Sequence, residues 1–276
     1  MYRAQVIGLS VRHAGKVFAL LLAILAVTSA ALFLARRWIP AAASLHAPVL
    51  DAQLHWTLID IGIIFLTAQL ALAAFVWKFH ARANQQTRRF PSGTRVAIIV
   101  GVAFIGLELF SAGTLGRRAW ASMYRGSEGA DAVTVEAMAQ QFAFYFRYPG
   151  EDGKFGPIHV DKIDPSIANY FGLDRAKDPA SKDDVVSAEL ALPVNRPVDL
   201  VLGAQDVVHS FYVRELRIQQ DMVPGMRIPV HFTPTKIGKY EIVCTQLCGL
   251  GHYRMRAYLR VMSETDFLRW IQAHRA

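Results

Sequence analysis

The stretch CTQLCGLGHYRM, residues 244–255, contains both cysteines of the chain together with a histidine and a methionine. Cys244 and Cys248 are four residues apart, His252 follows after four more, and Met255 comes three after that. A disulfide would close only a short loop and would restrict the unfolded chain little. Zinc accepts cysteine and histidine but has little use for a thioether, whereas thiolate and thioether together favour copper.

A single copper ion does not use all of these groups. An electron-transfer copper takes two histidines, one cysteine and a weak axial methionine, and His209 in QDVVHSFYV offers the second histidine. The loop then holds one thiolate too many, whereas two thiolates that bridge two coppers use both. Each metal would need one histidine and one weak axial group, which Met255 and a backbone carbonyl can provide. Gly249 and Gly251 allow the backbone to turn tightly between the ligands.

Three stretches, DVVHSFYV, QQDMVPGM and CTQLCGLGHYRM, resemble the binuclear copper domain of cytochrome c oxidase subunit II. The resemblance covers roughly residues 54–276 and implies a membrane-anchored, cupredoxin-like Greek-key β-sandwich. It implies electron transfer from cytochrome c to the haem groups of subunit I, where oxygen is reduced and protons are pumped, with no catalytic residue in this chain. The copper ligands that it implies are the side chains of His209, Cys244, Cys248, His252 and Met255 and the backbone oxygen of Gln246.

The chain departs from this family at several positions. Gln246 stands where many members have a glutamate that also helps to hold magnesium, and an amide is a poorer ligand for a hard cation, so no magnesium site is predicted. Phe142 and Phe144 stand where tryptophan is usual, and they are candidates for the point where electrons enter, although a buried strand aromatic is the competing interpretation. No Cys-x-x-Cys-His motif occurs, so we expect no haem in this chain and a separate electron donor.

Two acidic residues lie close to the predicted ligands in the sequence. Asp206 precedes His209 by three residues, and Asp221 lies in the stretch QQDMVPGM. Charges of this kind could steer a basic cytochrome c toward the copper, which would raise the rate of association more than the affinity. A simple solvated acid is the alternative at each position.

The positive charge of the chain lies in its first half. The net charge is +8, and residues 1–125 hold 13 Lys and Arg residues but only three acids. The same half contains three apolar runs, at 17–34, 54–77 and 96–115, each close to the ~20 residues that cross a bilayer. We therefore assign the basic residues to membrane flanks and exclude a nucleic-acid partner. Their distribution places the end of the third run outside the cytoplasm. With the resemblance, this implies a bacterial inner membrane with the copper domain on the periplasmic side.

The first apolar run has a second interpretation. A basic start, an apolar stretch and then PAAAS resemble a signal peptide with its cleavage site, although the run is long and Arg36 and Arg37 follow it. We divide the chain into an extra helix or signal peptide with its linker at 1–53, a transmembrane hairpin at 54–125 and the copper domain at 126–276. An extra helix could contact a quinol:cytochrome c oxidoreductase. Asp60 and Glu108 lie inside apolar runs, where ionisable groups suggest function.

Short β-rich runs punctuated by Gly, Pro and Asp follow residue 126 and predict an antiparallel sandwich or barrel. Ser263 begins a short C-terminal helix as its N-cap. A polar insert at 149–186 contains seven aspartates and is expected to be a long solvated loop, with a calcium site or a docking loop as alternatives. Six of these aspartates lie between residues 161 and 184, namely Asp161, Asp164, Asp174, Asp178, Asp183 and Asp184.

Three other functions compete with an oxidase subunit. A quinol oxidase subunit II would share the fold but lack the copper ligands. Nitrous oxide reductase carries the same copper site, but in a soluble protein with a large propeller. A membrane-tethered copper carrier would expose a few exchangeable ligands. The complete ligand set and the apolar runs favour the oxidase subunit over all three.

Overall fold

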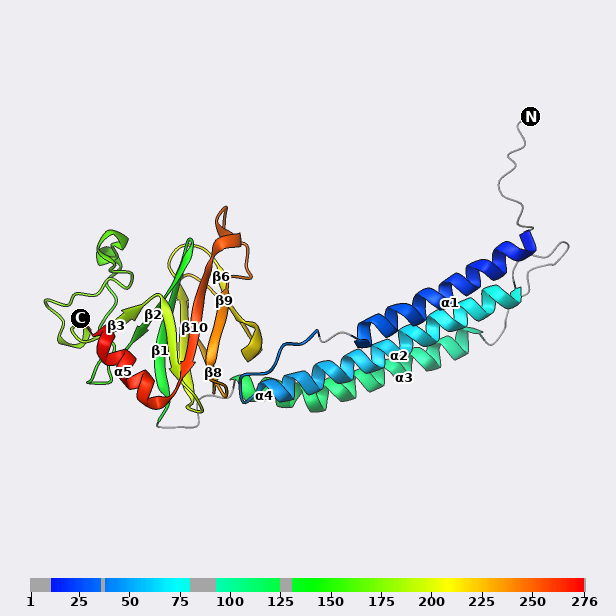
Figure 1. Cartoon of the computed structure of the whole chain (residues 1–276), viewed down its shortest axis with the longest axis horizontal. Coiled ribbons are helices and arrows are strands. Elements are labelled where there is room, and N and C mark those ends of the chain that lie inside the picture. The colour runs from blue at the N-terminus through cyan, green and yellow to red at the C-terminus, as the bar shows by residue number, and fades with distance from the viewer. Residues whose placement is uncertain (1–10, 36–37, 80–92, 125–130, 276) are drawn as a thin grey trace, which may run out of the picture. The chain divides into compact units, whose positions relative to one another are not determined.

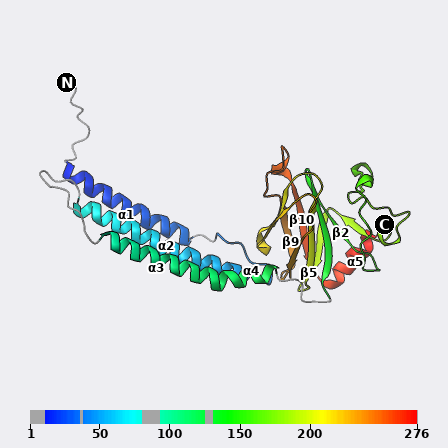
Figure 2. The ribbon, with the colours of Figure 1, turned by 180° about the vertical axis from the view of Figure 1, so that it is seen from behind.

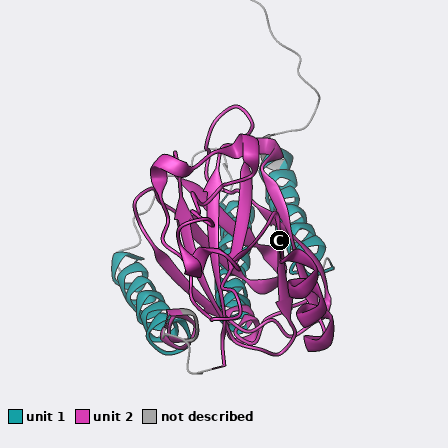
Figure 3. Ribbon diagram, turned by 90° about the vertical axis from the view of Figure 1, so that its left-hand side faces the viewer, with its two compact units in different colours: residues 1–39, 52–116 teal, residues 40–51, 117–276 magenta. Residues whose placement is uncertain are grey.

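The computed structural model describes residues 11–35, 38–79, 93–124 and 131–275. The chain divides into two compact units. One contains residues 1–39 and 52–116, and the other contains residues 40–51 and 117–276; Figure 3 draws them in teal and magenta.

The first unit consists of long apolar helices. They are α1 (Val11–Ala35), α2 (Ala47–Phe79) and α3 (Gly93–Ser111). α3 continues through a π-helical turn (Ala112–Gly116) into α4 (Arg117–Tyr124), which already belongs to the second unit. Within the described residues, three helices are long and apolar enough to cross a membrane. The helices α1, α2 and α3 run side by side (Figures 1 and 2). Apolar side chains on all faces suit a lipid environment, so the predicted transmembrane helices are confirmed.

Two acids of the membrane helices face each other. Asp60 of α2 is 9% exposed, and its side chain hydrogen bonds with that of Glu108 on α3. Toward the start of α2, Gln53 Nε2 donates to Ser111 Oγ at 3.3 Å. Hydrogen bonds between helices support their packing in lipid. The hydrogen bond between Asp60 and Glu108 therefore helps to hold α2 against α3. A further function for the two acids stays a prediction.

The second unit is a β-sandwich. Its described strands form two five-stranded sheets, in the orders β3-β2-β1-β5-β8 and β4-β10-β9-β6-β7. The strands are β1 (Val133–Gln140), β2 (Ala143–Tyr148), β3 (Val185–Ser187), β4 (Glu189–Pro193), β5 (Val198–Ala204), β6 (His209–Val213), β7 (Ile218–Met222), β8 (Ile228–Phe232), β9 (Gly238–Val243) and β10 (Arg256–Met262). Helix α5 (Glu264–His274) follows, and the Ser263 hydroxyl accepts a hydrogen bond from the Asp266 N–H at its start.

Both sheets are mixed, which differs from the antiparallel arrangement that we expected. β1 pairs in parallel with β5, and β10 pairs in parallel with β4. In both cases several strands, drawn from both sheets, separate the partner strands in sequence. The core lies between the sheets, where Val135, Leu200, Phe211 and Leu259 are fully buried.

The insert between β2 and β3 is ordered by its own polar groups. Its short 3₁₀ turns include Pro165–Ile167 and Pro179–Ser181, and each is capped by the aspartate that precedes it. At its base the fully buried Arg147 donates from Nε to Asp184 at 3.0 Å and from Nη1 to Glu136 at 3.1 Å. The insert is thus a long loop, as expected, and its own polar groups order its turns; the calcium site and the docking loop stay predictions.

Residues 40–51 also belong to the outer unit. The Ala43 N–H donates to Glu215 O at 2.9 Å, and its carbonyl accepts from Thr235 N–H at 2.8 Å. Arg217 donates to Asp51 at 2.8 Å and to Pro40 O at 2.6 Å. Residues 40–51, which include the first residues of α2, are therefore built into the second unit.

Candidate metal centre

Three strands of one sheet, β6, β9 and β10, bring the predicted ligands together. His209 is the first residue of β6, Cys244 directly follows β9, and the loop from Cys244 to Met255 leads into β10. This loop, which we call the metal loop, projects from one end of the sandwich (Figure 1). Its ends are joined by a hydrogen bond from Cys244 N–H to Met255 O at 3.2 Å. Strand pairing therefore fixes the two ends, and the ligands lie between them.

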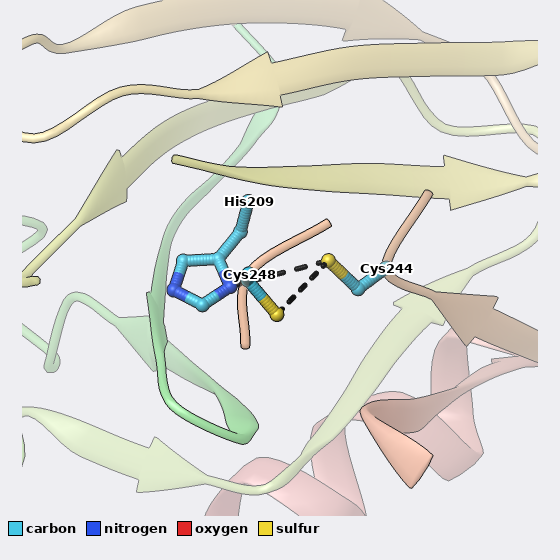
Figure 4. A group of neighbouring side chains, drawn as sticks. All are labelled: His209, Cys244 and Cys248. Atoms are coloured by element: carbon cyan, nitrogen blue, oxygen red, sulfur yellow. Dashed lines mark hydrogen bonds between the residues drawn. The ribbon is translucent and has the colours of Figure 1, made fainter. Parts of the chain in front are cut away.

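The two cysteine sulfurs lie close together without a bond. Cys244 Sγ and Cys248 Sγ are 3.8 Å apart, and both cysteines are free, whereas a disulfide bond is about 2.05 Å long. His209 Nδ1 lies 4.0 Å from Cys244 Sγ. Figure 4 shows the three side chains pointing toward one another, and their ligand atoms all lie within 4.8 Å. The disulfide alternative is not the arrangement that the structure adopts.

The other predicted ligands surround the same sulfurs. Cys248 Sγ lies 3.6 Å from His252 Nδ1 and 3.7 Å from Met255 Sδ. Cys244 Sγ lies 3.1 Å from Gln246 O. Two thiols, two imidazoles, a thioether and a carbonyl exceed the four ligands of a structural zinc site, and the soft donors among them suit copper. The structure thus brings together all six predicted groups, and their binding of metal stays a prediction.

The sulfurs of the site are shielded from solvent. Cys244 is 7% exposed, Cys248 4% and Met255 2%, and His209 is fully buried. Burial, and then the neighbouring Cys244 thiol, raise the pKa of Cys248 to about 11. A metal ion that binds here must therefore displace a proton from Cys248, because the thiolate is the ligand.

Two glycines of the metal loop are required by close packing. A Cβ atom on Gly251 would lie 2.4 Å from the ring of Phe142, and one on Gly249 would lie 2.7 Å from Gln141 Nε2. Gly249 also has a φ of +136°, which other residues rarely adopt. The turn between β1 and β2 thus lies directly against the metal loop.

The aromatic candidates occupy different environments. Phe142 is 39% exposed and lies against the metal loop, whereas Phe144 is 1% exposed and packs in the core. Packing accounts for Phe144 without any part in electron transfer. The position of Phe142 beside the metal loop suits a residue through which electrons enter. That role stays a prediction for Phe142 and for Phe144.

The two candidate docking acids also differ. The Asp206 carboxylate lies 2.8 Å from His209 Nε2 and accepts hydrogen bonds from Gln141 N–H and Val207 N–H, each at 2.8 Å. Burial raises the pKa of Asp206, but its bonds with His209 and the two N–H groups outweigh burial and lower it. Asp221 is exposed on β7. Asp206 is therefore engaged within the site, whereas Asp221 is available to a partner.

Gln141 was not among the residues singled out from the sequence. Its Nε2 donates to Cys248 O at 2.6 Å, across 107 residues of chain. A glutamine beside an aromatic residue is an ordinary feature of a strand end, so no local pattern marks it. Only the fold brings the turn and the metal loop together.

Fold and site together define a membrane-anchored β-sandwich protein with a thiol-rich candidate metal site. The family model for the periplasmic domain of cytochrome c oxidase subunit II matches residues 133–262. The alternative cytochrome c oxidase subunit 2 of Bradyrhizobium diazoefficiens is 33% identical over 256 residues, which are 92% of this chain and 90% of that relative. The chain belongs to the cytochrome c oxidase subunit II family.

Other relatives are more distant. Cytochrome c oxidase subunit 2 of Thermostichus vulcanus is 29% identical over 86% of this chain and 79% of its own length. The crystal structure of the periplasmic domain of subunit II (CoxB) of Bradyrhizobium japonicum is 24% identical, with a TM-score of 0.39, over 54% of this chain and 96% of that chain. Family membership makes this chain a copper-binding subunit of a membrane-bound oxidoreductase, assembled with other oxidase subunits, with its sandwich on the outer side of the membrane.

Proposed function

We propose that this chain accepts electrons from a cytochrome c at a binuclear copper centre in the metal loop and passes them to the haem groups of subunit I. Oxygen reduction and proton pumping take place there. The observation that carries the proposal is the pair of unbridged sulfurs 3.8 Å apart, surrounded by two imidazoles, a thioether and a carbonyl. Two copper ions held by both cysteines would share one electron, so that each metal–ligand bond would change little on electron transfer.

The protein would contribute ligands, orientation and shielding. The bridging groups would be Cys244 and Cys248, and the terminal groups would be His209, His252, Met255 and the Gln246 carbonyl. Asp206 holds His209 by its Nε2, so its Nδ1 faces the sulfurs. Hydrogen bonds of this kind fix the orientation of a metal-binding histidine and tune the metal. Burial of the sulfurs excludes water, which also bears on the redox potential.

The exposed face of the metal loop favours contact with another protein. Leu247 is 78% exposed, Leu250 97% and Tyr253 75%. Apolar side chains gathered on one exposed loop typically mark a protein interface. We assign this face to a protein partner of the assembled oxidase. Asp221 remains the candidate for steering a basic cytochrome c, and a quinol:cytochrome c oxidoreductase remains a candidate neighbour of α1.

The placement of the chain follows from the same proposal. We place it in the inner membrane of a bacterium, with the copper domain in the periplasm, and we retain the division into residues 1–53, 54–125 and 126–276. We also propose that α1 is kept in the mature protein. Ala43, at the predicted cleavage site, is 1% exposed, and both of its backbone groups are hydrogen bonded within the sandwich. The intact mass of the purified chain checks this directly.

A membrane-tethered copper carrier is the competing function. A carrier must release its metal and therefore needs accessible ligands, whereas His209 and Cys248 are 0% and 4% exposed. Affinity purification of the tagged full chain from membranes separates the two functions. The proposal expects co-purification of a haem-containing subunit and oxidation of reduced cytochrome c by the complex. It expects Cys244→Ser to keep the haem and lose the oxidation. A copper-loaded chain that purifies without haem would support the carrier.

A further inference from the structure

The turn between β1 and β2 supplies no predicted ligand but contacts two segments that do. Gln141 lies at this turn and donates two hydrogen bonds, one from its backbone and one from its side chain. Its backbone N–H donates to Asp206 Oδ2 at 2.8 Å, and its side-chain Nε2 donates to Cys248 O at 2.6 Å. One residue therefore connects the turn before β6 with the metal loop.

The connection continues to a second ligand. Asp206 Oδ1 lies 2.8 Å from His209 Nε2 and also accepts from Val207 N–H at 2.8 Å. A continuous series of hydrogen bonds thus runs from the Cys248 carbonyl through Gln141 and Asp206 to the His209 imidazole. Networks of this kind hold their members more rigidly than separate bonds do.

The ring of Phe142 reinforces the same contact. It lies so close to Gly251 that a Cβ there would stand 2.4 Å from it. The turn therefore packs against the metal loop at Gly249 and Gly251, and Gln141 binds the Cys248 carbonyl of the same loop. Movement of Cys248 relative to His209 would require breaking a hydrogen bond in a partly buried site.

We infer that Gln141 is a positioning residue that sets the location of Cys248 relative to His209 and thereby tunes the copper centre without touching it. The inference rests on the proposed function for the identity of the metal, and on the distances above for the position of the ligands. A ligand shell is held in its productive geometry by just such supporting contacts. The alternative is that Gln141 only stabilises the turn.

Substitution of Gln141 can be made selective. Any other non-proline residue keeps the backbone N–H that binds Asp206, so Gln141→Ala and Gln141→Glu change only the contact with Cys248. The alanine removes the donor, and the glutamate turns an acceptor toward the carbonyl oxygen. Gln140→Ala is the matched control, because Gln140 is the neighbouring glutamine and its side chain bonds to Tyr145 instead.

The test uses the full chain in detergent, with and without copper. We expect both Gln141 variants to shift the sulfur-to-copper absorption bands, the copper hyperfine pattern and the midpoint potential. We expect copper affinity to fall about ten-fold, which is the lower end of the usual loss when such a supporting contact is removed. Gln140→Ala should match the unmodified chain. Unshifted spectra and potential in both Gln141 variants, with only a lower melting temperature, would overturn the inference.

A metal-free measurement keeps the inference independent of the copper assignment. The chain has only two cysteines, and both are buried, so the rate of thiol alkylation reports on this site alone. We expect Gln141→Ala to speed alkylation under native conditions and Gln140→Ala to leave it unchanged. Equal rates in all three chains would contradict a positioning role. If the unmodified chain fails to bind copper while these rates still differ, the proposed function fails and the positioning role stands.

Discussion

The metal loop and the insert between β2 and β3 are both irregular segments rich in side chains that could bind a metal, yet they use them in opposite ways. In the insert, Asp164 accepts from Ser166 N–H at 2.9 Å and Asp178 from Ala180 N–H at 3.2 Å. In the metal loop, the sulfurs of Cys244 and Cys248 have as neighbours mainly other ligand-type atoms, at 3.1–4.0 Å.

This difference separates a binding site from a folded loop. Aspartates that cap turns and bind neighbouring cations have little capacity left for a metal ion, because their oxygens already accept hydrogen bonds. Thiols make only weak hydrogen bonds, so buried sulfurs gain most from a metal. The number of potential ligands in a segment is therefore a poorer guide to metal binding than the hydrogen bonds that these ligands already make.

The largest effect should come from removing a bridging group of the metal loop. Cys244→Ser replaces a soft thiolate by a hydroxyl that binds copper poorly, so we expect complete loss of the mixed-valence copper pair. Electron spin resonance of the copper-loaded full chain measures it. Asp178→Ser, in the insert, is the control and should leave the signal intact. A binuclear signal that survives Cys244→Ser would refute the assignment of the bridge.

At the base of the insert, removal of a buried charge should lower the stability of the fold and leave metal binding unchanged. Arg147→Met leaves the buried Asp184 without its cationic partner and leaves Glu136 paired with Arg227 only, which should cost about 3–5 kcal/mol of unfolding free energy. Denaturant unfolding of the full chain in detergent, followed by circular dichroism, gives the value. Arg260→Met, which breaks a half-exposed pair with Glu189 at 3.0 Å, should cost at most about 1 kcal/mol. Similar losses of unfolding free energy in both variants would contradict a larger contribution from the buried ion pairs than from the half-exposed one.

A milder change in the metal loop should alter the potential and spare the binding. Met255→Leu keeps the volume of the side chain and removes the thioether, a weak donor to the metal. We expect copper to stay bound and the midpoint potential to rise, because the oxidised form loses more from the missing donor than the reduced form does. Redox titration followed by absorption provides the check. A potential equal to that of the unmodified chain argues against Met255 as a ligand.

The smallest effect concerns pH and the segment at residues 40–51. Burial lowers the pKa of His46 below its ordinary value of 6.5, with the charge of Arg217 adding to this effect and a hydrogen bond with the Leu216 backbone opposing it. The unfolded chain therefore takes up a proton at higher pH than the folded chain, and stability should decline as pH falls below 6.5.

The comparison of two histidine variants isolates this effect. His46→Gln should flatten the decline in melting temperature between neutral and mildly acidic pH. His274→Gln, at an exposed position in the last turn of α5, should leave the decline as it is. An unchanged pH profile in His46→Gln would show that another group controls it.

Local patterns in the sequence were enough to predict much of this molecule. The apolar runs predicted the membrane helices, because length and composition alone decide that they suit lipid. The spacing within CTQLCGLGHYRM pointed to a soft metal, because the ligands of one loop lie within reach of one another. His209 could be added because it opens a strand.

Contacts between distant parts of the chain could not be predicted in this way. The bond from Gln141 to Cys248 spans 107 residues, and the engagement of Asp206 with His209 depends on which way the turn folds. The burial of Arg147 beside two acids required the sheet order, because the acids come from β1 and from the end of the insert. The parallel pairing of β1 with β5 likewise follows from topology and not from the strand pattern.

Copper quantitation with electron spin resonance on the purified full chain tests the central claim most directly. The account predicts two copper ions per chain and a signal in which one unpaired electron is shared equally by both. A single copper ion, or zinc alone at full occupancy, would contradict it.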